Sequence, residues 1–274
     1  MTSDKKSVER IERERRERED ALLLLLLLLA NRARIFIAHS LRDGQGVPRL
    51  NLPGLLDAIK SAMADSWVRG YDTSGKLGGV DLVDPEAEHE ETQEYERALG
   101  ALSAQAADVS EKIKQAIADV ATNAIANVDP DAHSKQVTAV NDAFVRAGWS
   151  NRSPSEIDPA STAKPGFAAS YWATDTILSA YNGGFRDAMK TGAIAPKLFA
   201  YRHHSVVDNR TTDICLERHE LTLPITHPYW RTNWPALHGR CRSIVLGVYH
   251  PTEFSDYLPE IPPAPGFGSI YSPI

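Results

Sequence analysis

Side chains able to bind a metal ion are concentrated in one stretch of this sequence, from Tyr201 to Tyr249. The stretch contains both cysteines of the chain, Cys215 and Cys241. It also contains five of the nine histidines, and His250 lies one residue beyond its end. Thiolate and imidazole groups are the preferred protein ligands of zinc. We therefore interpret this stretch as a module built around a local site.

The spacing of these groups suggests how a zinc ion would be held. Cys215 and His219 are four residues apart, which places them on one face of a helix. His238 and Cys241 are separated by two residues. The resulting Cys-x3-His and His-x2-Cys pairs predict a tetrahedral zinc site with Cys215, His219, His238 and Cys241 as metal ligands. The alternative is that both cysteines are small buried apolar residues and the histidines form hydrogen bonds in turns.

Sequence signatures of catalysis are absent. The chain has no G-x-S-x-G, H-E-x-x-H or dinucleotide-binding fingerprint, and its Thr73-Ser74-Gly75-Lys76 run is not a phosphate-binding loop. We expect no catalytic residues, no organic cofactor and no small-molecule substrate, and hence no enzyme. The alternative is a metal-dependent nuclease or toxin-like module, with His203-His204 and Asn233 as base and metal ligands.

Short elements are expected to hold these side chains. Hydrophobic alternation and turn residues predict a small α+β module, with strands over Tyr201–Val207, Glu220–Ile225 and Cys241–Tyr249 and a brief helix over Arg210–Arg218. The preceding segment, Phe167–Lys190, predicts a helix. Its Asn182-Gly183-Gly184 run would let the backbone of another element come close.

The N-terminal part is predicted to be helical. A charged run over Ser3–Asp20, with acids and bases interspersed, indicates a solvated helix. Ala21–Ala30 contains eight consecutive leucines, which is too short for a membrane span of about 20 residues and has apolar side chains on every side. We expect protein to cover it; contact with a membrane is the alternative.

Further helices are expected before the module. Periodic apolar residues predict them over Leu55–Trp67, from Asp84-Pro85 to Asp129-Pro130, and over Ala132–Ala147, with a turn at Gly70–Gly79. The predicted fold is mainly α, with a long-helix N-terminal domain and the small α+β C-terminal module, a possible zinc knuckle. The predicted ranges are an N-terminal segment 1–30, a helical domain 31–148, a linker 149–166, the module 167–250 and a Pro/Gly-rich tail 251–274.

Composition limits the function. A chain of 274 residues with net charge −6 and pI near 5.9 has no overall basic character of the kind that nucleic-acid binding produces. Two cysteines do not form a disulfide framework, so a reducing compartment such as bacterial cytoplasm is expected.

Several motifs resemble those of a known family. They are Ala173-Thr174-Asp175-Thr176, Ala180-Tyr181-Asn182-Gly183-Gly184, Asp208-Asn209-Arg210-Thr211-Thr212 leading to Cys215, and Pro235-Ala236-Leu237-His238-Gly239-Arg240-Cys241-Arg242. In order and spacing this set resembles the minor head proteins of tailed bacteriophages, the head-morphogenesis group that includes protein F of phage Mu. The likeness covers about Phe167 to Tyr249. The family commonly has Cys-x2-Cys and Cys-Arg-Cys, where this chain has Thr212 and Ser243 in place of two cysteines.

The resemblance implies a structural virion protein at or near the portal vertex, inside the capsid, that assists head assembly and DNA packaging or ejection. The implied partners are the portal protein, the major capsid protein and other copies of the chain, with phage DNA as a further candidate. The implied locations are the virion and, during assembly, the host bacterial cytoplasm.

Overall fold

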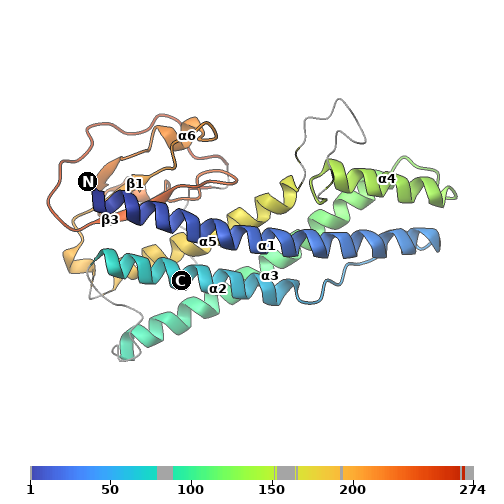
Figure 1. Cartoon of the computed structure of the whole chain (residues 1–274), viewed down its shortest axis with the longest axis horizontal. Coiled ribbons are helices and arrows are strands. Elements are labelled where there is room, and N and C mark those ends of the chain that lie inside the picture. The colour runs from blue at the N-terminus through green and yellow to red at the C-terminus, as the bar shows by residue number, and fades with distance from the viewer. Residues whose placement is uncertain are drawn as a thin grey trace. The chain divides into compact units, whose positions relative to one another are not determined.

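The computed structural model describes residues 2–78, 89–150, 152, 164, 166–191, 194–265 and 267–268, with the backbone alone for 2–12 and 89–95. Over these residues the chain is mainly helical, with a small three-stranded antiparallel sheet in its C-terminal part (Figure 1). The predicted fold class is confirmed. The helices are α1 (Thr2–Arg42), α2 (Leu55–Leu77), α3 (His89–Ile125), α4 (His133–Arg146), α5 (Phe167–Lys190) and α6 (Asp213–Leu216), and the strands are β1 (Ala200–His204), β2 (Thr222–Pro224) and β3 (Ile244–Val248).

The chain divides into two compact units, each made of two separate stretches of sequence. Unit 1 contains Met1–Ser61 and Gln105–Ala173, and unit 2 contains Ala62–Ala104 and Thr174–Ile274. These units do not follow the consecutive ranges expected from the sequence. Most of the predicted linker 149–166, and the predicted helix start at Asp84-Pro85, lie outside the described residues.

In unit 1, α1 is one continuous helix through the charged run, the leucine run and the residues that follow. Every third or fourth side chain along one face is buried; these are Leu22, Leu26, Leu29, Ala33, Ile37 and Leu41. The other face remains exposed at Leu24 and Leu28, with 57% and 54% of their surfaces accessible. Among the described residues, the leucine run is therefore buried on one face and exposed on the other.

The apolar part of α1 is longer than the eight leucines. Among the described residues, one helical stretch, Arg13–Arg42, has the length and composition of a membrane span. The core helix of a soluble protein or a signal sequence has the same properties, and 39% of the most apolar window in this stretch is buried. The sequence argument from length counted only Ala21–Ala30, whereas the helix continues without a break through Ile37.

Helix α4 packs against α1 within unit 1. Arg34 of α1 donates to the Oδ1 of Asn141 on α4 at 2.5 Å, and the ring of His133 lies 3.2 Å from the Arg42 carbonyl at the end of α1. Val140 and Phe144 form the buried face of α4. These contacts bind the C-terminal half of α1 into unit 1.

In unit 2, α2 and α5 approach closely at glycines. A Cβ at Gly70 would lie 2.1 Å from the Tyr181 carbonyl oxygen, and one at Gly184 would lie 2.0 Å from the Trp67 carbonyl oxygen. The expectation that a mid-helix glycine allows close approach is confirmed. The turn predicted at Gly70–Gly79 is wrong, because α2 continues to Leu77 with Tyr71 stacked on Trp67.

The sheet of unit 2 has the order β2-β1-β3. Tyr201 of β1 lies opposite Leu223 on one side and Gly247 on the other. Because β1 is central, the residues at its end, His203 and His204, lie between the segments that follow α6 and those that precede β3. The sheet therefore brings together the ligand-bearing segments predicted from the sequence.

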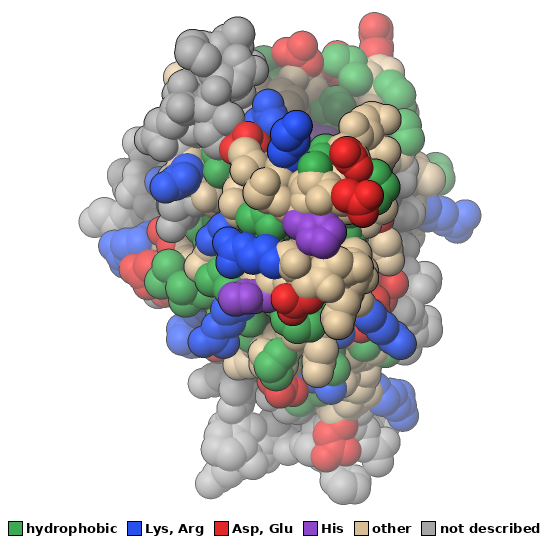
Figure 2. Space-filling view, turned by 90° about the vertical axis from the view of Figure 1, so that its right-hand side faces the viewer, with side chains coloured by type: hydrophobic (Ala, Val, Ile, Leu, Met, Phe, Trp, Pro, Cys, Tyr) green, Lys and Arg blue, Asp and Glu red, His purple; other side chains and the backbone are tan. Residues whose placement is uncertain are grey.

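One face of the surface shows how the charged side chains are distributed. On the face drawn in Figure 2, the basic side chains of the described residues form small groups with acidic side chains between them. An extended basic area of the kind that binds a nucleic-acid backbone is not visible among the described residues on this face.

Candidate metal centre

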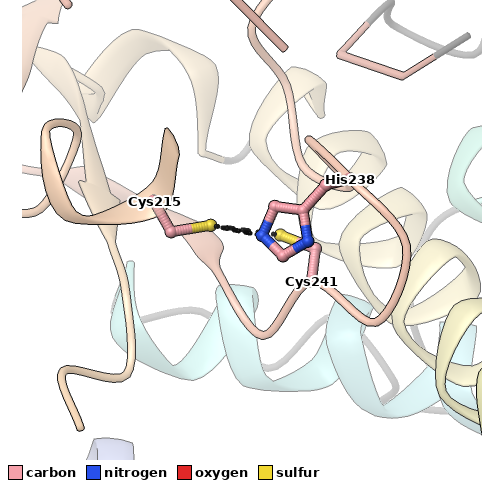
Figure 3. A group of neighbouring side chains, drawn as sticks. All are labelled: Cys215, His238 and Cys241. Carbon is pink, nitrogen blue, oxygen red and sulfur yellow. Dashed lines mark hydrogen bonds between the residues drawn. The ribbon is translucent and has the colours of Figure 1, made fainter. Parts of the chain in front are cut away.

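Three of the four predicted ligands lie together in unit 2. Cys215 is in the short helix α6, whereas His238 and Cys241 are in the turn that precedes β3. The Cys241 amide donates to the His238 carbonyl at 3.2 Å, which closes this turn, and Arg240 within it has the left-handed φ of 58°. The side chains of the three residues point toward one another (Figure 3).

The distances among the three ligand atoms suit a tetrahedral metal ion. The two sulfur atoms of Cys215 and Cys241 are 3.7 Å apart, and the Cys215 sulfur lies 3.0 Å from Nε2 of His238. Zn–S bonds of about 2.3 Å at tetrahedral angles separate two sulfurs by about 3.8 Å. The sulfur pair already has this spacing as free thiols, and binding requires the His238 ring to move outward by about half an ångström.

The His238 ring has the orientation of a metal ligand. Its Nδ1 lies 2.8 Å from the Gly239 carbonyl oxygen, to which an Nδ1–H donates. This bond leaves Nε2 facing the sulfur of Cys215, and Nε2 is the atom that would bind a metal once the proton it shares with Cys241 is displaced. Metal-bound histidines in proteins usually donate their second ring nitrogen to an acceptor in this way.

The electrostatics of the pair favour one thiolate. Burial opposes ionisation of Cys241, but hydrogen bonds from Cys215 and His238 outweigh it and hold the pKa of the Cys241 thiol well below its usual value. The Cys215 thiol donates to that sulfur and is itself buried, so its pKa is raised. Burial lowers the pKa of His238, but the hydrogen bond and charge of Cys241 reverse the effect, and the net shift is upward. A bound cation would replace the proton that these groups share.

Hydrogen bonds around Cys215 hold it in place. The Ser243 hydroxyl donates to the Cys215 sulfur at 3.2 Å, and the Ser205 hydroxyl donates to the Cys215 carbonyl at 2.7 Å. The two hydroxyls lie 3.0 Å apart. Ser243, which stands in place of a cysteine that the resembling family commonly has, therefore supports the site through a hydrogen bond.

The two sequence motifs are joined by an ion pair. Both Arg242 terminal nitrogens bond to the carboxylate of Asp208, at 2.6 and 2.8 Å. The hydrogen bonds from Arg242 and from the Arg210 backbone hold the pKa of Asp208 well below its usual range. Asp208 thus acts as a structural link between the Asp-x-Arg-Thr and Cys-Arg elements.

The fourth predicted ligand is placed elsewhere. His219 is not part of the cluster of Cys215, His238 and Cys241; it lies instead with His204 and Glu220. Near the expected fourth position is the Thr212 hydroxyl, 3.0 Å from Nε2 of His238. A pocket of about 20 Å³ opens beside the cluster, lined by Val206, Arg210, Thr211, Thr212, Cys215, His238, Arg240, Arg242 and Ser243. This volume has room for about one water molecule.

Two of the residues suggested for a nuclease, His203 and Asn233, are held by burial or by hydrogen bonds within the fold. His203 is fully buried, and burial lowers its pKa to about 3. The Asn233 side chain accepts from Arg218 at 2.8 Å and donates to the Tyr229 carbonyl at 3.2 Å. Among the described residues, His203 belongs to neither group of potential His, Cys, Asp and Glu metal ligands, whereas its neighbour His204 belongs to one of them.

One buried carboxyl group near the centre was not singled out from the sequence. Burial raises the pKa of Asp175 on α5 to about 6, partly offset by a hydrogen bond from the Arg240 backbone. Among the described residues, its buried Oδ1 has no hydrogen-bond partner. Asp175 belongs to one of the motifs that carry the family resemblance, which is the only sequence signal for its position.

Comparison of the chain with protein-family models, with curated proteins and with solved structures finds no match.

Proposed function

We propose that this protein is a structural component of a tailed-phage head, a minor head protein, and that a zinc ion bound by Cys215, His238 and Cys241 holds its C-terminal module together. The observation that carries the proposal is the meeting of the two most specific motifs. Asp208 and Cys215 come from one motif, and His238, Cys241 and Arg242 from the other, and the ion pair and the ligand cluster join them.

In this proposal the metal has a structural role. Cys215, His238 and Cys241 lie in a four-residue helix and a turn, elements too short to hold their positions by internal hydrogen bonds alone. A bound zinc ion contributes directly to the folding free energy of such a module. A water molecule in the adjacent pocket, within reach of the Thr212 hydroxyl, completes the tetrahedron.

Helix α1 supplies a surface for assembly. Its exposed apolar residues include Leu24, Leu28, Ile35 and Phe36. We propose that this side packs against the portal protein, the capsid protein or another copy of the chain inside the head. Localisation in the virion, and in host cytoplasm during assembly, belongs to the same proposal.

Mass spectrometry of purified particles tests the function. In the phage that encodes this chain, the protein should be present in particles at few copies. A Leu24→Gln/Leu28→Gln variant should be depleted from them while remaining folded, because both side chains are exposed. A matched variant carrying Arg16→Gln and Glu17→Gln on exposed positions of the same helix should be incorporated normally. Absence of the wild-type protein from particles would refute the proposal.

One observation favours the alternative of a metal-dependent nuclease. Three protein ligands beside a water-sized pocket is the arrangement of many catalytic zinc sites. Plasmid DNA incubated with the protein and Mg²⁺, Mn²⁺ or Zn²⁺ separates the two functions. We expect no cleavage; cleavage by the wild type that is lost in His238→Ala would establish the nuclease instead.

A further inference from the structure

A second group of potential metal ligands lies at the end of β1, in the same unit. Its members are His204, His219 and Glu220, each offering one ligand atom within 4.8 Å of the other two. We propose that these three residues form a second site for a divalent transition-metal ion such as zinc or cobalt. The site shares no ligand with the Cys215, His238 and Cys241 cluster and does not depend on the proposed function.

The spacing suits a small ion. Oε1 of Glu220 lies 2.9 Å from Nδ1 of His204 and 3.9 Å from Nε2 of His219. Zinc bonds of about 2.0–2.1 Å to nitrogen and oxygen at tetrahedral angles place neighbouring ligand atoms about 3.3 Å apart. The two observed distances lie on either side of this value. Movements of about half an ångström would therefore form the site.

The Glu220 carboxylate is oriented by a second set of contacts. Its Oε2, the oxygen that does not face His204, lies 3.7 Å from Nη1 of Arg202. Arg202 is itself held by a 3.0 Å hydrogen bond from its Nε to the hydroxyl of Thr222. The carboxylate thus presents Oε1 to both imidazoles. Such outer contacts fix ligand orientation in established metal sites.

The backbone at Glu220 is strained in a way that places its side chain. Its φ is 63°, a left-handed value that non-glycine residues rarely adopt. The conformation is held by a 2.8 Å hydrogen bond from the Glu220 amide to the His203 carbonyl. Strain of this kind tends to occur at functional sites. Here the left-handed conformation places the Glu220 side chain beside His204, the residue that follows His203 in β1.

Two existing hydrogen bonds oppose the site. Nδ1 of His204 donates to Oε1 of Glu220 at 2.9 Å, and this proton must leave before Nδ1 can bind an ion. The Ser205 amide donates to Nδ1 of His219 at 3.3 Å, whereas coordination through Nε2 requires a proton on Nδ1. The ion must therefore replace this long bond. We expect weaker binding here than at the cysteine cluster, whose histidine already has the required tautomer.

The ligand set and exposure define the class of ion. Two imidazoles with one carboxylate suit zinc and related first-row ions, whereas calcium and magnesium prefer oxygen ligands alone. The three side chains are 22%, 31% and 50% accessible, so the ion can enter and retain water.

Cobalt titration of the full-length protein under reducing conditions tests the site. The wild type should bind two Co²⁺ ions. The tighter one should show the sulfur-to-cobalt charge-transfer absorption expected of the cysteine cluster, and the weaker one only ligand-field bands without sulfur character. Glu220→Gln should weaken the second event at least tenfold and leave the charge-transfer band unchanged, which also shows that the module remains folded.

Two further variants make the result unambiguous. Glu253→Gln, at an exposed glutamate of the same unit, should bind both ions like the wild type. Cys215→Ser/Cys241→Ser should lose the charge-transfer band and keep the sulfur-free event, so failure of the first site does not obscure the second. Absence of the sulfur-free event in the wild type, or its persistence at full affinity in Glu220→Gln, would show that His204 and Glu220 form a hydrogen-bonded pair only and would overturn the proposal.

Discussion

Two adjacent glycines of α5 should respond in opposite ways to the same substitution. A Cβ added at Gly183 would meet the Trp67 indole at 3.5 Å from Cδ1 and 4.0 Å from Nε1, both ordinary contacts with a side chain. A Cβ added at Gly184 would lie 2.0 Å from the Trp67 carbonyl oxygen and 2.8 Å from the Tyr71 amide nitrogen. Both of the latter atoms belong to the α2 backbone and cannot move by changing a rotamer.

The magnitudes follow from this difference. Replacing a mid-helix glycine with alanine gains about 0.5–1 kcal/mol of helix stability when nothing else changes, which is the outcome expected for Gly183→Ala. At Gly184 the helices must separate, and overpacking costs about 1–3 kcal/mol or more. Separation also weakens the 3.0 Å hydrogen bond from Trp67 to the buried Asp187 carboxylate. We expect Gly184→Ala to be about 2 kcal/mol less stable than the wild type.

Urea unfolding followed by tryptophan fluorescence measures both variants under one condition. The expected result is a midpoint above that of the wild type for Gly183→Ala and well below it for Gly184→Ala. Gly70→Ala provides the reciprocal test on α2, because its Cβ would meet the Tyr181 carbonyl at 2.1 Å. If Gly184→Ala were as stable as Gly183→Ala, the helices would not cross at these glycines and the close approach described above would be wrong.

Three further predictions concern pH, metal and the leucine run. Because the pKa of His203 is about 3 when folded and near 6.5 when unfolded, the unfolded chain binds a proton that the folded chain does not, and the contribution of His203 to stability should fall by about 2 kcal/mol from pH 7.5 to 5. The raised pKa of Asp175, about 6, acts in the opposite direction over this range, so the test is the difference between wild type and variant: in urea unfolding, His203→Asn should gain about 2 kcal/mol relative to the wild type between these pH values, whereas the exposed control His250→Asn should not. Elemental analysis should find a tightly bound zinc ion that is lost in Cys241→Ser. Zinc at about 100 times its Kd should raise the stability of the wild type by about 2.7 kcal/mol. An unchanged melting temperature on chelation would contradict a structural metal. Leu26→Ala, at a buried position, should cost about 2–5 kcal/mol, whereas Leu24→Ala should change stability by less than about 0.5 kcal/mol, and equal effects would show that the two faces of α1 are not distinct.

Local patterns predicted the helices well where tertiary structure did not intervene. Periodicity and the flanking glycine and proline residues placed α5 at its observed bounds and α4 within one residue at each end. The end of α2 was missed because its Gly, Ser and Lys residues are typical of a turn. This segment is helical in the structure because Trp67 and Gly70 pack against α5, which lies more than a hundred residues later in the sequence.

The candidate site was predicted in part for a similar reason. His238 and Cys241 are close in sequence and share one turn, so their spacing was informative. Cys215 and His219 would share a face only if the helix continued between them, but α6 ends at Leu216 and the chain turns away before His219. The pairing of His219 with His204 depends on how the chain returns alongside β1, which no local spacing encodes.

The leucine run shows most clearly where sequence information ends. Eight identical side chains carry no helical phase, so their composition cannot indicate which face is buried. The phase comes from the flanking residues: Ala33, Ile37 and Leu41 continue the buried face of Leu26 and Leu29, and Arg34 binds Asn141 on α4 beside it. The exposed leucines, Leu24 and Leu28, are those on the opposite side of the helix from this buried face. Among the described residues the leucine run thus has one buried and one exposed face, and the exposed face, at Leu24 and Leu28, is where a second contact of α1 would lie in the proposed assembly.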